Sequence, residues 1–500
     1  MTYKNPVISG FFPDPSVCRV NDTYYLVASS FQFFPGVPLF ESKDLINWDM
    51  IGNVLTRESQ LPLQGTNSSS GIFAPTIRYN DGRFYMVTTN TTTGGNFYVY
   101  TDDIHGEWSD PLFVEQSGID PSLYFEDGKT YFMSNGYDDE GKSGIIQCEI
   151  DIATGKKLSK SKCIWGGCGG RFLESPHLYK IGDTYYIMAS EGGTEYGHMV
   201  VYGKGNSVYG PFESYAKNPV LTNRNCGGYQ IQGCGHADLV EDTKGNWWLI
   251  HLGFRQIGQW VMHHTTGREC YLCPVEFDES GWFTVGENGT TRAEFNTDKI
   301  DTEQTKWDKF TFENTRVGRE WIFLRNPIME NYDLSDKSFK LMPTKLNLAE
   351  NDNSPTFIAI RQKELNQTTE CKVNAPTDEA GLTLYMTGEQ HYDLAVCKAE
   401  NGYEVVKRLC IGDICHEDRV VSIPDCKAKL VIKATNYAYI FLCECNGEVF
   451  DLGGAQTKYL STEIAGNFTG VVTGLYAVKT SDEKSQWAEF TDFCCTNDEE

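Results

Sequence analysis

The sequence predicts an all-β protein, a five-bladed β-propeller followed by a C-terminal β-sandwich. One hairpin pattern occurs five times in the first 295 residues. Its copies are spaced 46 to 61 residues apart, a period typical of propeller blades. Beyond about residue 320 the pattern stops and short strand signals follow at even spacing, with little helix signal.

The five copies share a short alternating run, a tight turn and an aromatic-rich run. That combination indicates a β-hairpin. A single hairpin cannot bury both of its faces, whereas radial repetition lets each blade cover the next. The copies read DPSVCRVNDTYYLVASS from Asp14, APTIRYNDGRFYMVTT from Ala74, DPSLYFEDGKTYFMSNG from Asp120, SPHLYKIGDTYYIMASEGG from Ser175 and HADLVEDTKGNWWLIHLG from His236.

Several copies have a reactive side chain at or next to their first position. In a propeller the innermost strands line a central channel, so equivalent positions of different blades converge there. Asp14, Asp120 and His236 hold that position in three copies, and Glu174 comes one residue before it in a fourth. Three carboxylates and one imidazole are therefore expected in one pocket. We also expect extended backbone before the prolines, although an Asp before Pro often only caps a turn.

The chain divides into three parts. Residues 1–295 are predicted to form the propeller. Residues 296–320 are polar, charged and poor in periodic apolar residues, which predicts a linker or a strap. Residues 321–500 contain short strand signals such as FIAIRQ, GLTLYMT and KLVIKAT, which favour a sandwich that contributes to the rim of the pocket.

Composition narrows the classes of partner. A formal charge of −25 opposes binding to nucleic acid, because that affinity depends on Lys and Arg. There is no apolar span of membrane length and no visible leader, so we expect no membrane partner and a cytoplasmic protein, or a secreted one if a leader has been removed. Most of the 17 cysteines are expected to be free. A homo-oligomer is left open.

The clustered carboxylates point to glycoside hydrolysis. That reaction commonly uses one carboxylic acid to protonate the leaving oxygen and one carboxylate on the far side of the sugar. Carboxylates from separate blades fit the wide spacing that admits a water molecule and gives inversion. A third carboxylate near the acid would raise its pKa. No cofactor is needed for this chemistry.

Three segments resemble glycoside hydrolase family 43: FFPDPSV, GIDPSLYF and FLESPHLYK. The resemblance implies that Asp14 is the general base, that Asp120 tunes and orients the acid, and that Glu174 is the general acid. Glu174 is followed by Ser175 where the family usually has Gly.

Further segments extend the resemblance. GCGHADLV implies that His236 lies at the channel floor, where relatives contact a sugar-side network or a calcium ion, and HTTGREC implies that Arg268 binds substrate hydroxyls or holds the carboxylates. Phe31 and Phe73 are candidates for the aromatic wall of the sugar subsite, and Phe73 stands where Trp is usual. KYLSTEIAGNFTGVVTGLYA resembles the C-terminal sandwich of two-domain members, which implies that Phe468 reaches the pocket.

These observations predict an inverting, exo-acting glycosidase that releases terminal β-D-xylosyl or α-L-arabinofuranosyl units from xylo-oligosaccharides and arabinoxylan fragments. Its partner is then a small carbohydrate. Two rival hypotheses remain at this point. A carbohydrate-binding propeller without catalysis would keep the aromatic residues, and a protein-interaction propeller would need none of the pocket chemistry.

Overall fold

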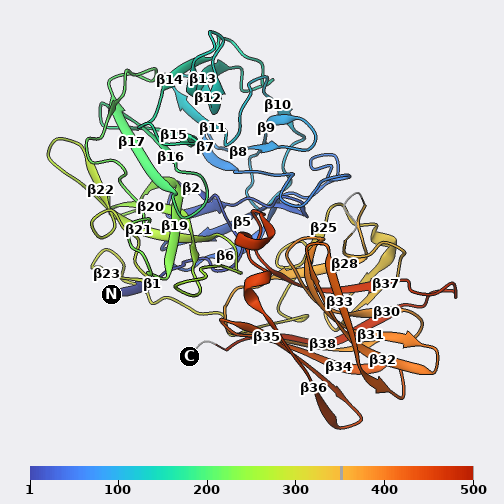
Figure 1. Cartoon of the computed structure of the whole chain (residues 1–500). Coiled ribbons are helices and arrows are strands. Elements are labelled where there is room, and N and C mark those ends of the chain that lie inside the picture. The colour runs from blue at the N-terminus through green and yellow to red at the C-terminus, as the bar shows by residue number, and fades with distance from the viewer. Residues whose placement is uncertain (350–352, 499–500) are drawn as a thin grey trace.

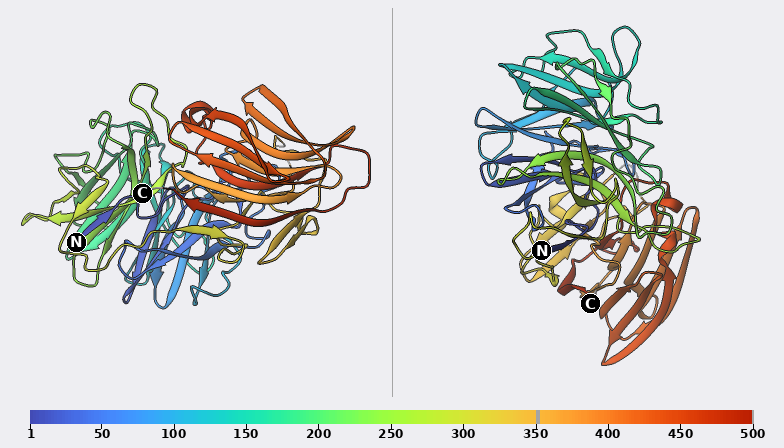
Figure 2. Two further views of the ribbon diagram at one scale, coloured as in Figure 1. Left: turned by 90° about the horizontal axis from the view of Figure 1, so that it is seen from below. Right: turned by 90° about the vertical axis from the view of Figure 1, so that its left-hand side faces the viewer.

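The computed structural model describes residues 1–349 and 353–498 and confirms the all-β fold class. Figure 1 shows the propeller, coloured blue to yellow-green, beside the sandwich in orange and red. Figure 2 shows the same two bodies in contact from two further directions. The described part of the chain contains no helix that could cross a bilayer, and its α-helix, α1 (Thr462–Ala465), has four residues.

The propeller consists of five four-stranded antiparallel sheets, each continuous in sequence. Each blade starts at the channel and ends at the outer edge. The strands are β2 (Ser16–Val20), β3 (Thr23–Val27), β5 (Gly36–Ser42) and β6 (Asp49–Leu55); β7 (Thr76–Asn80), β8 (Arg83–Asn90), β9 (Gly95–Thr101) and β10 (Leu112–Phe113); β11 (Ser122–Glu126), β12 (Lys129–Tyr137), β13 (Ser143–Ile150) and β14 (Lys162–Trp165); β15 (Glu174–Ile181), β16 (Thr184–Glu191), β17 (Met199–Gly205) and β18 (Glu213–Ser214); and β19 (Ile231–Glu241), β20 (Trp247–Arg255), β21 (Glu269–Phe277) and β22 (Phe283–Val285).

The repeated pattern folds as the hairpin that joins the two innermost strands of each blade. In blades one to three the turns contain Asn21, Asp81 and Asp127 at positive φ, as two-residue hairpin turns of the primed types require. The first strands of neighbouring blades touch one another around the ring, including β19 against β2. At the outside, β1 (Thr2–Lys4) pairs with β23 (Glu294–Asn296) and ties the start of the chain to the end of the propeller.

The sandwich packs two eight-stranded sheets around an apolar interior. One sheet contains β26 (Tyr332–Leu334), β27 (Ser338–Leu341), β38 (Ala488–Asn497), β29 (Gln367–Asn374), β34 (Lys427–Ala434), β35 (Ala438–Cys445) and β36 (Glu448–Gln456), with β24 (Lys309–Thr311) paired to β38. The other contains β33 (Ile414–Ile423), β32 (Gly402–Ile411), β31 (Gln390–Ala399), β30 (Glu379–Tyr385), β37 (Val472–Val478), β28 (Phe357–Arg361) and β25 (Ile322–Leu324). The described residues also contain two 3₁₀ helices, η1 (Met329–Asn331) and η2 (Thr457–Tyr459).

The two domains share a sheet. The eighth strand of the second sheet is β4 (Phe33–Phe34), which belongs to blade one in sequence and pairs with β25. Phe11, Phe31 and Phe33 of the propeller pack in one apolar cluster with Ile322 and Phe357 of the sandwich. The stretch 296–320 that we expected to be a linker or strap contains β24, which is part of the sandwich. The junction is therefore a packed core, which holds the sandwich rigidly against the pocket side of blade one.

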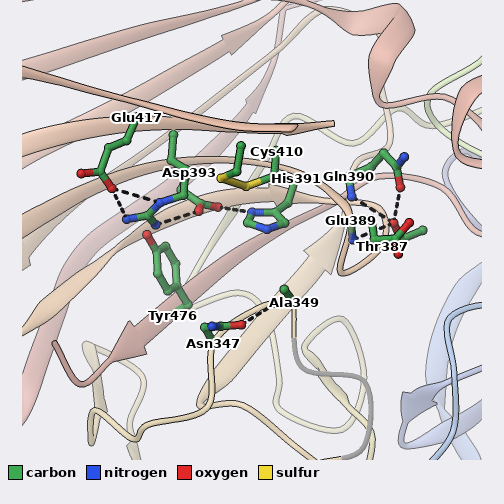
Figure 3. Close-up of polar contacts among 12 residues, drawn as sticks. Asn347, Ala349, Thr387, Glu389, Gln390, His391, Asp393, Cys410, Glu417 and Tyr476 are labelled. Carbon is green, nitrogen blue, oxygen red and sulfur yellow. Dashed lines mark hydrogen bonds and ion pairs between the residues drawn. A yellow bond between two sulfur atoms is a disulfide. The ribbon is translucent and has the colours of Figure 1, made fainter. Parts of the chain in front are cut away.

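An ion network lies on one sheet of the sandwich, and Figure 3 shows three of its members, Glu417, Asp393 and His391. Arg408 pairs with Glu379, Asp393 and Glu417, and Asp393 also accepts from the ring of His391. One disulfide joins Cys410 and Cys415 across the β32–β33 hairpin. The other 15 cysteines of the described residues form no disulfide.

Candidate active site

The first residue of four of the five repeat copies has an unusual backbone conformation. Asp14, Asp120, Ser175 and His236 have φ of 58°, 54°, 53° and 42°, so all four are left-handed. Our expectation of extended backbone before the prolines is wrong for Asp14, Asp120 and Ser175. Tertiary contacts override the local bias, and strained backbone of this kind concentrates at functional sites. The family usually has Gly at the position of Ser175. The positive φ explains this preference, because Gly adopts such a conformation without steric strain.

Asp14 is held by three groups in a buried setting. Ser29 Oγ donates to Asp14 Oδ2 at 2.5 Å, and Arg268 Nη1 donates to Asp14 Oδ1 at 3.0 Å. His236 Nδ1 lies 3.7 Å from Oδ1. Burial acts to raise the pKa of Asp14, but Arg268, His236 and Ser29 outweigh it and leave the pKa below its ordinary value. Asp14 is therefore an anion at neutral pH, as a general base must be.

Asp120 and Glu174 have the opposite electrostatics. Burial, followed by the charges of Glu174 and Asp14, raises the pKa of Asp120 well above its ordinary value. Burial, followed by the charge of Asp14, raises the pKa of Glu174 to about 7, although Arg268 opposes the shift. The backbone N–H of Ser175 donates to Asp120 Oδ2 at 3.1 Å and fixes Asp120 beside the residue that follows Glu174. Glu174 is therefore about half protonated at pH 7 and more so at lower pH, which allows it to act as a general acid.

His236 lies between two of the carboxylates. Its Nδ1 is 3.7 Å from Asp14 and 4.0 Å from Asp120, and its backbone N–H donates to Ser190 Oγ at 2.7 Å. Burial lowers the pKa of His236, so the ring is neutral at pH 7. Among the described residues, no three His, Cys, Asp or Glu side chains are arranged to hold a metal ion. Calcium prefers several oxygen ligands, so the neutral imidazole of His236 is by itself a poor ligand for it.

Three phenylalanine rings form a wall beside Arg268, and Phe31 is the buried one, with an exposed fraction of 2%. The ring of Phe31 lies 5.3 Å from that of Phe73 and 6.0 Å from that of Phe468. Arg268 lies 5.8 Å above Phe31 and 5.7 Å above Phe468, so the wall adjoins the catalytic carboxylates. Phe468 is 40% exposed, which shows that its ring is not part of the sandwich core.

The loop that carries Phe468 is fastened to the propeller through its backbone. Ser69 Oγ accepts from the Phe468 N–H at 2.8 Å, and the Phe468 carbonyl accepts from Arg268 Nη2 at 3.2 Å. A Cβ added to Gly267 would lie 2.9 Å from the backbone nitrogen of Gly470, so the loops of Arg268 and Phe468 are in direct contact. The sandwich therefore completes the pocket.

All the residues singled out from the sequence meet here, but the sequence reasoning missed their supports. Thr194 Oγ1 accepts from Arg268 Nη1 at 2.7 Å and orients the guanidinium, and nothing in the repeats marks it. Ser29 and Ser190 had a detectable signal, since they occupy the same place in YYLVASS and YYIMASE, at the end of the second strand of their blades.

Comparisons with known proteins agree with this geometry. Residues 3–283 match the family model of glycosyl hydrolases family 43. The chain belongs to glycoside hydrolase family 43. Residues 309–496 match a second model, the β-xylosidase C-terminal concanavalin A-like domain. This family 43 member is thus a glycosidase, and the two rival hypotheses without catalysis are set aside.

Relatives resemble this family 43 protein over their whole length. A non-reducing end α-L-arabinofuranosidase of Bacteroides ovatus is 39% identical, with 99% of this chain and 95% of the relative covered. A xylosidase/arabinosidase of Butyrivibrio fibrisolvens is 36% identical, with 98% of each covered. The solved structure of GH43B from the xyloglucan PUL of Bacteroides ovatus superposes with a TM-score of 0.91 at 37% identity and 99% coverage of both chains.

Proposed function

We propose that this enzyme is an exo-acting, inverting glycosidase that removes terminal β-D-xylosyl or α-L-arabinofuranosyl units from xylo-oligosaccharides and arabinoxylan fragments. The observation that carries the proposal is the opposite protonation of Asp14 and Glu174 in one pocket. Asp14 has a lowered pKa and Glu174 a pKa raised to about 7, so a base and an acid coexist at neutral pH.

Glu174 acts first on the leaving group. Its carboxylic proton passes to the glycosidic oxygen as the C–O bond breaks. The charge of Glu174 is one cause of the raised pKa of Asp120, so the two carboxyl groups are close enough to interact during this step. Because Ser175 N–H holds Asp120 in place, the spacing of the two carboxyl groups is set by the backbone.

Asp14 acts on water. Its anionic carboxylate takes a proton from a water molecule that attacks the anomeric carbon from the opposite face, which inverts the configuration. Arg268 keeps Asp14 ionised, and its remaining N–H groups can donate to sugar hydroxyls. Phe468 and the half-buried Phe73 offer apolar surface to the sugar ring, and the buried Phe31 packs against both of them.

The sandwich supports exo action. A propeller channel alone is open at its mouth, whereas here the Phe468 loop is bound to Ser69 and Arg268 at the pocket. A pocket closed on one side accommodates a terminal sugar better than an internal one. The printed names of the relatives, a non-reducing end α-L-arabinofuranosidase and a xylosidase/arabinosidase, support both sugar classes.

The direct test measures aryl β-xyloside and aryl α-L-arabinofuranoside hydrolysis by the wild type, Asp14→Asn and Glu174→Gln. On aryl glycosides whose leaving group still needs protonation, each substitution should lower turnover roughly 10²- to 10⁴-fold, the usual contribution of a general acid or base. Asp102→Asn, which removes an exposed carboxylate on blade two, serves as the matched control and should keep full activity.

Leaving-group dependence separates the two roles. A good leaving group does not need protonation, so it should rescue Glu174→Gln more than Asp14→Asn. Equal rescue of both variants would contradict the assignment of acid and base. Absence of hydrolysis of either aryl glycoside by the wild type would contradict the proposed substrate class.

A further inference from the structure

A large cleft lies away from the catalytic carboxylates, between the propeller, the sandwich and the segment 296–320 that connects them, here called the strap. Its volume is about 1100 Å³. Phe12 and Arg255 line it from the propeller, Trp307 from the strap, and Arg361 and Lys363 from the sandwich. Asp14, Asp120 and Glu174 are not among its lining residues.

Arg361 brings an uncompensated charge to this cleft. It ends β28 and is only 3% exposed. Within the part of the chain that the structure describes, Nε and Nη2 of Arg361 are buried and have no hydrogen-bond acceptor. Its guanidinium lies 4.5 Å above the ring of Phe12 and 5.7 Å above that of Phe11, so its neighbours are aromatic faces. Burial alone lowers its pKa to about 9, which leaves it charged at pH 7.

Lys363 places a second cation on the same face of the chain, two residues further on. Its Nζ lies 5.9 Å above Phe12 and 4.9 Å above Phe310. Burial lowers the pKa of Lys363, and the charge of Arg361 also lowers it, against the effects of Glu320 and Glu364. The two cations therefore face a common space.

The nearby carboxylates are engaged with other groups. Glu364 pairs with Arg255 at 2.6 Å and accepts from Trp307 Nε1 at 3.1 Å. Glu320 accepts from the backbone N–H of Arg316 at 2.8 Å. A buried charge without a partner is strongly unfavourable, and a guanidinium pairs best with the planar or tetrahedral oxygens of carboxylate and phosphate.

We propose that Arg361 and Lys363 form an oxyanion-binding site in the cleft between the domains, which takes the carboxylate of an acidic sugar or a phosphate group. The bound oxyanion would lie against Phe12 of the propeller and receive hydrogen bonds from the sandwich, so it would hold the two domains together. Phe12 is two residues before Asp14, which connects this site to the pocket through the backbone.

Thermal unfolding tests the site on the full chain. The protein is dialysed into an amine buffer with chloride at pH 7.5, and inorganic phosphate or sodium glucuronate is titrated at constant ionic strength. We expect a saturable rise in Tm with at least one of the two, because a ligand that binds only the folded state stabilises it. A response to phosphate alone identifies a phosphate group, and a response to glucuronate identifies a sugar carboxylate.

Substitutions of the two proposed ligand-binding residues test where the oxyanion binds. Arg361→Gln should weaken the apparent Kd at least tenfold, and Lys363→Gln severalfold, whereas Lys433→Gln, an exposed lysine of β34, should match the wild type. If Arg361→Gln does not fold, Lys363→Gln and isothermal titration of the wild type decide the matter. No saturable response to either oxyanion, or responses in Arg361→Gln and Lys363→Gln equal to the wild type, would overturn the proposal and leave Arg361 with only its aromatic contacts.

Discussion

Replacing Arg268 by Gln should move both limbs of the pH profile of kcat/KM toward alkaline pH. The acid limb reports deprotonation of the base, and the alkaline limb reports deprotonation of the acid in the free enzyme. Arg268 lowers the pKa of Asp14 and also opposes the rise in the pKa of Glu174. Its removal therefore raises both pKa values.

The two shifts should differ in size. Arg268 lies 3.0 Å from Asp14, and an opposite charge this close to a buried Asp is worth about 1 to 3 pKa units. The acid limb should rise by about that amount. For Glu174, Arg268 is the weakest of three influences, so its limb should rise less from its starting value of about 7. The active pH window should move upward and become narrower.

The assay follows xylose release from xylobiose between pH 3 and 10, because a disaccharide needs the proton of Glu174. Arg268→Lys keeps a positive charge and should restore part of the acid limb. Arg83→Gln removes a guanidinium that pairs with Asp102 on the outside of blade two, and it should leave the profile unchanged. An acid limb that stays in place in Arg268→Gln, or moves to lower pH, would refute the electrostatic reasoning.

Three further predictions follow from the site. NMR during the first minutes of hydrolysis should show a sugar product of inverted configuration, and a retained anomer would mean that the inferred gap for water is absent. Phe468→Ala should lower kcat/KM on xylobiose about tenfold, since each ring contact is worth about 1 kcal/mol and the backbone bonds of Phe468 survive the change. Ile464→Ala, which truncates a 49% exposed neighbour on α1, is its control, and a large drop in Tm without loss of efficiency would make Phe468 structural. Exhaustive chelation should leave the rate unchanged, and a loss that calcium restores would reinstate a metal near His236.

The architecture and most of the residues of the site can be predicted from the amino-acid sequence. Five copies of one hairpin, with reactive residues at equivalent positions, require a ring in which Asp14, Asp120 and His236 converge. This is possible because repetition converts one local pattern into a global geometry. Repetition does not identify Arg268 and Phe468, since neither lies in a repeat, and only the resemblance to the family indicates them.

Only the tertiary structure decided the backbone conformation, the charge states and the domain junction. The left-handed φ of Asp14 and Asp120 opposes the bias of the following proline, so it exists because the ring enforces it. The pKa of Glu174 depends on burial and on the charge of Asp14, which is 160 positions away in the chain. The short strand of Phe33–Phe34 joins the sandwich because β25 offers it a free edge, and no local signal in blade one marks such a long-range pairing. Interactions between segments that are distant in sequence depend on the folded structure, so no local pattern predicts them. Hairpins and their repetition depend on neighbouring residues, so the sequence does predict them.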